Sequence, residues 1–160
     1  EFRRVLFRSQ TWRKTMSKEL RDYTRNEDFN NEMQVNPNTL TTLLLNAAIE
    51  KVSDAKQCHE EKRFAKKGFL IGRATAIVDG LRDRLDMSQG EIAGEFEQFY
   101  SDIDNALQES IEDDGVQALT DIVNALTEIR NLWQDVVTEI EVAQGTYDYI
   151  VAETEMDKAA

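Results

Sequence analysis

The chain has 160 residues, 41% of them hydrophobic and 31% charged, which is the composition of one globular domain and not of a disordered chain. Its formal net charge of −12 speaks against binding to nucleic acids or to an anionic membrane face, because both need clustered lysine and arginine. The sequence contains no run of about 18 apolar residues, so no membrane-spanning helix is expected. The single cysteine, Cys58, excludes an internal disulfide and is consistent with a reducing compartment.

The first nine residues, Glu1 to Ser9, look like one reading frame of a sequencing-adapter oligonucleotide; the alternative is a genuine basic arm. Their apolar run is too short for a signal peptide. We expect residues 1–15 to be adapter and untranslated sequence, with the protein starting at Met16. Residues 16–36 predict a mobile or partly helical N-terminal arm, because their isolated apolar residues follow no clean period. These apolar residues are Leu20, Tyr23, Phe29 and Met33.

Asn36 and Pro37 predict the start of the first helix. Asparagine can accept a hydrogen bond from the free amides of the first turn, and proline suits the first helical position. This helix is expected to run from Pro37 to about Glu61, with apolar residues at steps of three and four on one face. Leu45 and Ile49 widen that face beyond a single stripe. The residues expected to point inward are Leu40, Leu43, Leu44, Ala47, Ala48, Val52 and Ala55.

Three more amphipathic helices are predicted, over about Phe64 to Leu85, about Glu91 to Glu112 and about Val116 to Val142. Gly72 and Gly80 lie inside the first of these, which close approach of a neighbouring helix would explain. The inward residues of the three helices are Leu70, Ala74, Ile77, Leu81 and Leu85; Ile92, Phe96, Phe99, Tyr100, Ile103, Leu107 and Ile111; and Leu119, Ile122, Val123, Leu126, Ile129, Trp133, Val136, Val137 and Ile140.

Short connections make successive helices antiparallel neighbours. The sequence therefore predicts an all-α fold, an antiparallel up-down-up-down four-helix bundle over residues 37–142. After a break at Gln144-Gly145, residues 143–160 are expected to form an acidic C-terminal tail that can carry a short docking helix. Aromatic rings are expected to fill the space between the third and fourth helices. The expected core anchors are Leu44, Phe96, Tyr100 and Trp133.

Candidate chemistry is sparse. His59 is the only histidine and follows Cys58 directly. Adjacent residues on a helix point about 100° apart, so the two do not form a catalytic pair. One histidine cannot supply the two Glu-x-x-His motifs of a di-iron bundle. Glu112-Asp113-Asp114 lacks the ligand spacing of a calcium loop and is interpreted as a solvated helix end. We therefore expect no catalytic activity, no metal and no cofactor.

Residues of all four expected helices and of the loop before the third form one pattern, which ends in an Arg-x-x-Trp motif. They are Pro37-Asn38-Thr39-Leu40, Leu44, Ala48-Ile49, Ala55-Lys56, Leu81, Leu85-Asp86-Met87, Gly90-Glu91-Ile92-Ala93, Tyr100, Leu119, Val123, Glu128, Arg130 and Trp133. Over about residues 35–137 this pattern resembles the flagellar secretion chaperone FliS family. Two stretches depart from the family's usual pattern: Val35-Asn36-Pro37 replaces Ala-Ser-Pro, and Leu45-Asn46-Ala47 replaces a Tyr followed by Asp-Gly.

The resemblance implies a cytosolic chaperone, monomeric when free, that binds the disordered C-terminal segment of flagellin. It would prevent premature polymerisation and present its cargo to the export gate. The extra apolar residues Leu45 and Ile49 are the expected cargo contacts, together with Tyr23 and Phe29 of the arm that covers them in the free state. Leu45→Glu is expected to abolish flagellin binding and leave the bundle folded. The alternative is a structural or regulatory bundle that self-associates through its first helix.

Overall fold

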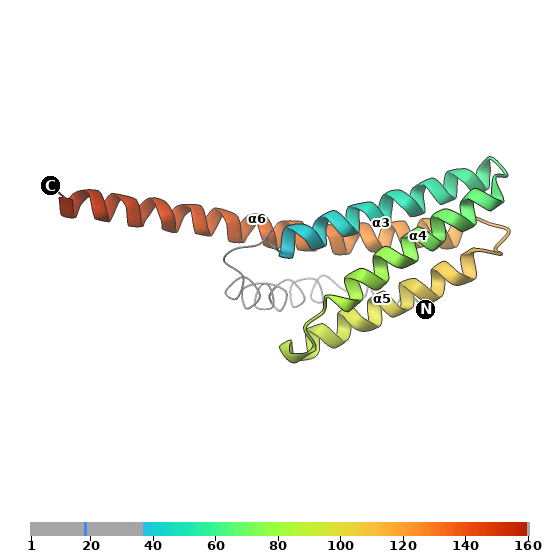
Figure 1. Ribbon diagram of the computed structural model, residues 1–160, viewed down its shortest axis with the longest axis horizontal. Helices are drawn as coiled ribbons and strands as arrows, with labels where there is room; N and C mark the ends of the chain where they lie inside the picture. The colour runs from blue at the N-terminus through green and yellow to red at the C-terminus, as the bar shows by residue number, and fades with distance from the viewer. Residues whose placement is uncertain (1–17, 19–36, 160) are drawn as a thin grey trace.

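The computed structural model describes Lys18 and residues 37–159. Residues 37–159 form four long α-helices, and none of them lies in a strand (Figure 1). The predicted all-α fold class is confirmed for this part of the chain. The predictions for residues 1–15, and for the arm over residues 16–36 apart from Lys18, fall outside it. The elements are α3 (Pro37–Glu60), α4 (Phe64–Asp83), the short 3-10 helix η1 (Met87–Gln89), α5 (Glu91–Ser110) and α6 (Gln117–Ala159).

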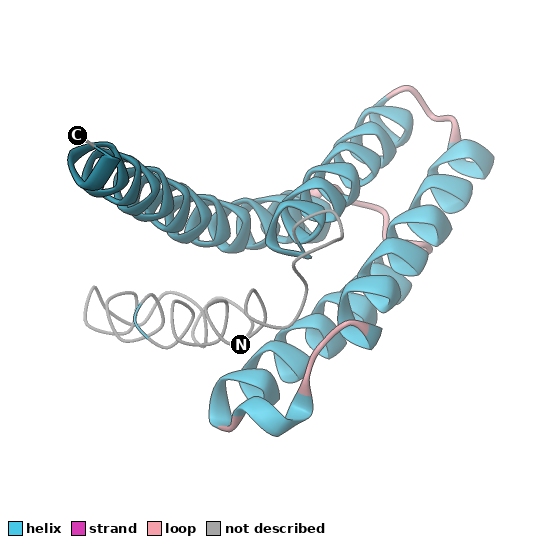
Figure 2. Ribbon diagram, turned by 60° about the vertical axis from the view of Figure 1, so that its left-hand side comes forward, coloured by secondary structure: helices cyan, strands magenta, loops and turns pink. Residues whose placement is uncertain are grey.

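The four helices pack in a ring. Each successive helix reverses direction, and Figure 2 shows how short the connections between them are. α3 contacts α4 and α6, and α5 also contacts α4 and α6. Each long helix therefore has two helical neighbours, and the apolar stripes of all four meet in one core.

The core is rich in aromatic residues where α5 faces α6. The Phe96 ring stacks on Tyr100 with centroids 6.1 Å apart and tilts against Trp133 at 5.8 Å. Phe99 meets Tyr100 edge to face at 5.5 Å. All four rings are buried, whereas Leu44, the remaining predicted core anchor, is half-buried against the core. Offset and edge-to-face aromatic pairs add to the stabilisation that burial alone provides.

α3 ends in a tight turn that needs a left-handed residue. Lys62 has φ of 60°, and it is the one non-glycine residue with positive φ among the described residues. The Arg63 amide donates to the Cys58 carbonyl at 2.7 Å, and the Lys62 amide donates to the His59 carbonyl at 3.0 Å. These two bonds satisfy carbonyls that the helix end would leave free, in the arrangement of a Schellman motif. Lysine thus occupies a position that favours glycine.

The loop between α4 and α5 is shaped by Asp86 and Gly90. Asp86 Oδ1 accepts hydrogen bonds from the Ser88 hydroxyl at 2.6 Å and the Ser88 amide at 3.0 Å, and Gln89 Nε2 donates to Asp86 Oδ2 at 3.0 Å. These bonds hold the pKa of Asp86 below its usual value, and the bond from the Ser88 hydroxyl has the largest effect. Gly90 has φ of 85° and ψ of −152°, a backbone region that is almost restricted to glycine. Two residues of the family-like loop therefore set its path.

Gly72 and Gly80 do not mark a close helix contact. A β-carbon at either position would meet no atom within 4 Å, so the predicted close approach is wrong. Alanine would fit at both positions.

α6 is much longer than predicted. The sequence predicts a helix end near Val142, but α6 continues without interruption to Ala159, so that prediction is wrong. A single glycine such as Gly145 costs a helix only about 1 kcal/mol, and no proline follows it. Figure 1 shows the C-terminal part of α6 extending past the other helices, and the side chains of residues 149–158 are exposed.

Candidate cargo-binding site

The packing of α3 decides which of its apolar residues reach the surface. Leu45 is 0% exposed, whereas Leu43, predicted to point inward, is 56% exposed. The prediction for Leu43 is wrong, because the run Leu43-Leu44-Leu45 allows three stripes and the packing selects the one through Leu45. Residues of the selected stripe alternate steps of four and three, as one helix face requires. They are Thr41, Leu45, Ala48, Val52 and Ala55, all buried.

The four residues expected to bind cargo therefore differ in position. Leu45 is inaccessible while α3 keeps its packing, and Ile49 lies half-buried at the edge of the core. Glutamate at position 45 would bury an unpaired charge, so a folded Leu45→Glu variant is no longer expected. Tyr23 and Phe29 lie outside the described residues. The cargo role of all four residues stays a prediction.

Other apolar side chains are exposed to solvent. Phe64 and Met87 are more than half exposed, and Phe69 on α4 is 65% exposed. Phe69 lies next to Leu70 but off the buried stripe of α4, which also contains Ala74 and Leu81. The sequence signal for this exposed ring is an aromatic residue that lies outside the inward period of the helix.

His59 and Lys67 tie the α3–α4 end of the molecule to the loop before α6. Buried Lys67 donates from Nζ to His59 Nδ1 at 3.0 Å and to the Asp113 carbonyl at 3.1 Å. His59 Nε2 lies 3.1 Å from the Asp114 carbonyl. With Nδ1 accepting, Nε2 carries the proton and donates it. Both imidazole nitrogens are thus in structural hydrogen bonds, and Cys58 beside them is buried.

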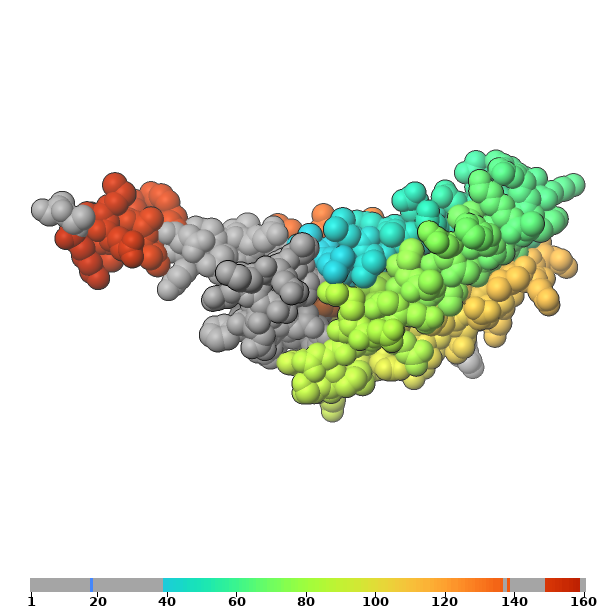
Figure 3. All heavy atoms as spheres, viewed as in Figure 1, coloured from blue at the N-terminus to red at the C-terminus, as the bar shows by residue number. Residues whose placement is uncertain are grey.

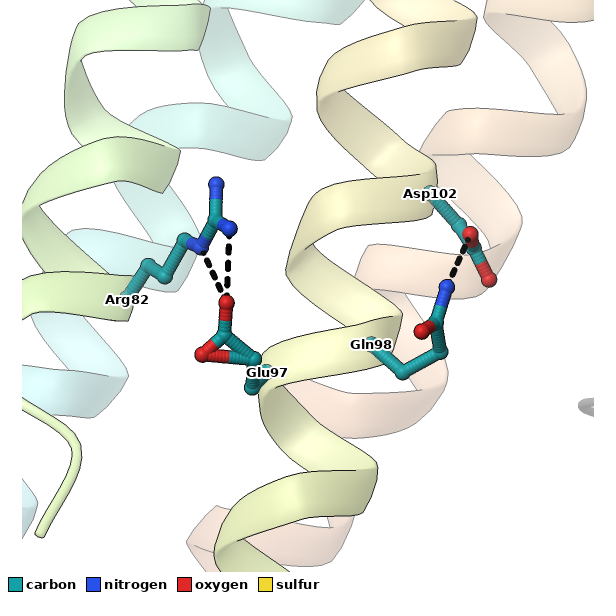
Figure 4. A network of polar contacts seen from close by, with 4 residues as sticks. All are labelled: Arg82, Glu97, Gln98 and Asp102. Atoms are coloured by element: carbon teal, nitrogen blue, oxygen red, sulfur yellow. Dashed lines mark hydrogen bonds and ion pairs between the residues drawn. The ribbon is translucent and has the colours of Figure 1, made fainter. Parts of the chain in front are cut away.

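An ion pair joins α4 to α5. Arg82 donates from Nε and Nη2 to Glu97 Oε1 at 2.8 and 2.6 Å (Figure 4). This bond raises the pKa of Arg82 above its ordinary value. On the side of α5 away from Arg82, Gln98 Nε2 donates to Asp102 Oδ1 at 2.8 Å. The Arg82–Glu97 pair therefore links α4 to α5.

Among the described residues at this interface, Asp104 is the one whose carboxyl has a strongly shifted pKa. Its Oδ1 is buried and accepts no hydrogen bond. Burial, and then the hydrogen bond and charge of Asp79, raise the pKa of Asp104 to about 7, and the positive charge of Arg82 partly offsets them. Two carboxylates from adjacent helices cannot both ionise cheaply at short range. A pKa near 7 means that Asp104 changes its charge near neutral pH.

The acidic stretch after α5 does not build a metal site. Glu112, Asp113 and Asp114 are all exposed, and Asp113 Oδ1 accepts the Gly115 amide at 3.1 Å as part of the turn. Across the described residues, no group of three or more potential ligands is close enough to hold a metal ion. No helix in the same part of the chain has the length and apolar character needed to cross a bilayer.

Comparison with known proteins identifies the chain. The family described as "Flagellar protein FliS" matches residues 19–140. The chain belongs to the FliS family. The flagellar secretion chaperone FliSB of Pseudomonas aeruginosa is 30% identical over 102 residues, covering 63% of this chain and 81% of the relative. The flagellar secretion chaperone FliS of Vibrio cholerae is 27% identical over 104 residues, covering 64% and 76%. The resemblance inferred from the sequence is confirmed, and the FliS match stops before the exposed end of α6.

Proposed function

We propose that this protein is a cytosolic flagellar export chaperone that binds the C-terminal segment of flagellin, prevents its premature polymerisation and aids its export. The single observation that carries the proposal is the FliS match over residues 19–140. Both relatives are named flagellar secretion chaperones. The activity requires binding without chemistry, which agrees with the structural roles of His59 and Lys67. The export gate is the partner that receives the complex.

The proposed mechanism is coupled folding and binding on an antiparallel four-helix bundle. A disordered cargo segment forms amphipathic helices as it buries its apolar side chains on the chaperone. The buried surface offsets the cost of ordering the segment. Ile49, at the edge of the core, is the proposed first contact on α3, and Leu45 beneath it becomes accessible only if the packing opens. Tyr23 and Phe29 cover this region in the free, monomeric chaperone.

The test is a titration of the chain, starting at Met16, with a flagellin C-terminal peptide. Ile49→Gln removes the apolar edge of the proposed contact and is expected to weaken binding about tenfold, which corresponds to about 1.4 kcal/mol of buried apolar surface. Met87→Gln is the matched control, because Met87 is an exposed apolar residue of η1, outside α3. Equal affinities of the two variants, with both folded by circular dichroism, would reject the α3 contact.

One observation favours the alternative, a bundle that self-associates through α3. Leu43 presents a large apolar side chain on the outer face of that helix. In this case the sedimentation coefficient should fall on dilution, and Leu43→Gln should abolish the dependence. A chaperone that is monomeric when free predicts no effect of Leu43→Gln on sedimentation.

A further inference from the structure

The N-terminal half of α4 presents a positively charged face on a strongly acidic protein. The stretch from Lys62 to Val78 holds five basic residues and no acidic one, in a chain of net charge −12. Lys66, Phe69 and Arg73 follow one another at steps of three and four, so they lie on one side of α4. Lys62 lies in the turn that leads into this helix. All four are exposed. We call these four residues the basic face of α4.

Phe69 gives this face an apolar centre. Its ring is 65% exposed, and the Arg73 guanidinium carbon lies 5.9 Å from the ring centroid, a cation–π distance. A large exposed aromatic ring between lysine and arginine is typical of a surface that receives a partner side chain, because aromatic and arginine residues dominate interface energetics. The charge on the face selects for a partner rich in carboxylates.

The end of α6 has the opposite character. Tyr149, Glu153 and Met156 recur at steps of four and three, and Asp157 flanks them on the same side. Tyr149 is 63% exposed, Met156 is 74% exposed, and both carboxylates are exposed. The Tyr149 hydroxyl donates to Glu153 Oε1 at 2.7 Å, which holds that carboxylate on this side. We call these four residues the acidic end of α6.

The two faces cannot meet within one molecule. The Lys67 hydrogen bond to the Asp113 carbonyl places the first turn of α4 beside the loop that leads into α6. Tyr149, the first residue of the acidic end, lies about 32 residues after Gln117 in α6, which is about 50 Å at 1.5 Å per residue. Figures 1 and 3 show the start of α4 and the end of α6 at opposite ends of the molecule. Only a second molecule can bring the two faces together.

We propose that the acidic end of α6 in one copy docks on the basic face of α4 in a second copy. In this contact Phe69 packs between Tyr149 and Met156, while the carboxylates Glu153 and Asp157 pair with the flanking cations. The contact is head to tail, so each copy keeps a free face at either end and the association is open-ended unless the rotation closes it into a ring.

The association is weak. Each side contributes at most about three helical turns, so the contact buries well below the roughly 1,200 Å² total of stable complexes. Only a transient association, detectable well above micromolar concentration, is expected. The net charge of both copies opposes it at low ionic strength, and high salt screens the exposed ion pairs that favour it. The chain therefore remains monomeric at the micromolar concentrations used to measure flagellin binding, and the inference does not depend on the proposed function.

Charge swapping tests the proposal on the full chain. Sedimentation velocity from about 10 μM to about 1 mM should show a sedimentation coefficient that rises with concentration. Lys66→Glu with Arg73→Glu, or Glu153→Lys with Asp157→Lys, should weaken association at least tenfold, because each change makes the two faces alike in charge. An equimolar mixture of the two double variants should associate again, since each face then finds an opposite one.

The chain with all four substitutions is the matched control, because its net charge equals that of the unaltered chain. It should associate within about threefold of the unaltered chain. All four side chains are exposed, so circular dichroism should show an unchanged fold. An unaltered chain that stays monomeric up to about 1 mM overturns the proposal. The proposal is also overturned if the mixture, or the chain with all four substitutions, fails to regain association. In that case an acidic helix of another protein would be the partner of the basic face.

Discussion

The turn after α3 offers the sharpest test of the structure, because lysine stands where glycine is favoured. Lys62 has φ of 60°. The left-handed conformation costs a non-glycine residue about 1–2 kcal/mol, and the greater freedom of glycine in the unfolded chain gives back up to about 1 kcal/mol. Lys62→Gly should therefore raise the free energy of unfolding by about 0.5–1 kcal/mol and the melting temperature by about 2–3 °C.

The assay is urea denaturation followed by circular dichroism, with thermal melts in parallel. Arg63→Gly is the matched control, since the neighbouring Arg63 has φ of −93° and ψ of 68° and gains nothing from glycine. Lys62→Ala separates the backbone from the side chain, because it removes the ammonium and keeps the strained β-carbon; its stability should be close to that of the unaltered chain. A Lys62→Gly variant as unstable as Arg63→Gly would refute the left-handed turn.

Four further substitutions are expected to change stability, measured by the same urea denaturation. Gly72→Ala should stabilise by about 0.5–1 kcal/mol, because the position is helical and open, whereas Gly90→Ala should destabilise by about 1–3 kcal/mol at its positive φ; the reverse signs would contradict the structure. Phe96→Ala should cost about 3–5 kcal/mol, and a smaller loss would mean that the aromatic cluster can collapse. Asp104 has its pKa raised to about 7, above about 4 in the unfolded chain, so its contribution to stability falls as pH rises from about 4 to about 7 and stays lost above. Asp104→Asn should remove this fall and be about 1 kcal/mol more stable than the unaltered chain at pH 8, a value discounted for solvent screening. If the variant and the unaltered chain have the same pH dependence of stability, the buried carboxyl is contradicted.

The helix starts were predictable because local chemistry sets them. Pro37 and Phe64 begin α3 and α4 where the sequence predicts, and Glu91 begins α5 directly after a glycine with positive φ. The end of α6 was not predictable from Gly145, since one glycine weakens a helix without breaking it. The end of α6 depends on the helix propensities summed over many residues, and no proline follows Gly145 to break the helix.

The surface was harder to predict than the fold. Leu43 and Leu45 are identical residues two positions apart, and only packing against α4 and α6 decides that one is exposed and the other buried. In the sequence, the basic face of α4 is part of a run of basic residues in an acidic chain. Its significance depends on the exposure of Phe69 and on the distance to the end of α6, which require the folded structure.

The most direct test of the central claim is isothermal titration calorimetry of the chain starting at Met16 with a flagellin C-terminal peptide, with circular dichroism on the same samples. The account predicts submicromolar binding at one peptide per chain, a gain of helix, and a negative heat-capacity change from buried apolar surface. Absence of binding to flagellin peptides from several motile bacteria, by a chain shown to be folded, would contradict the chaperone function.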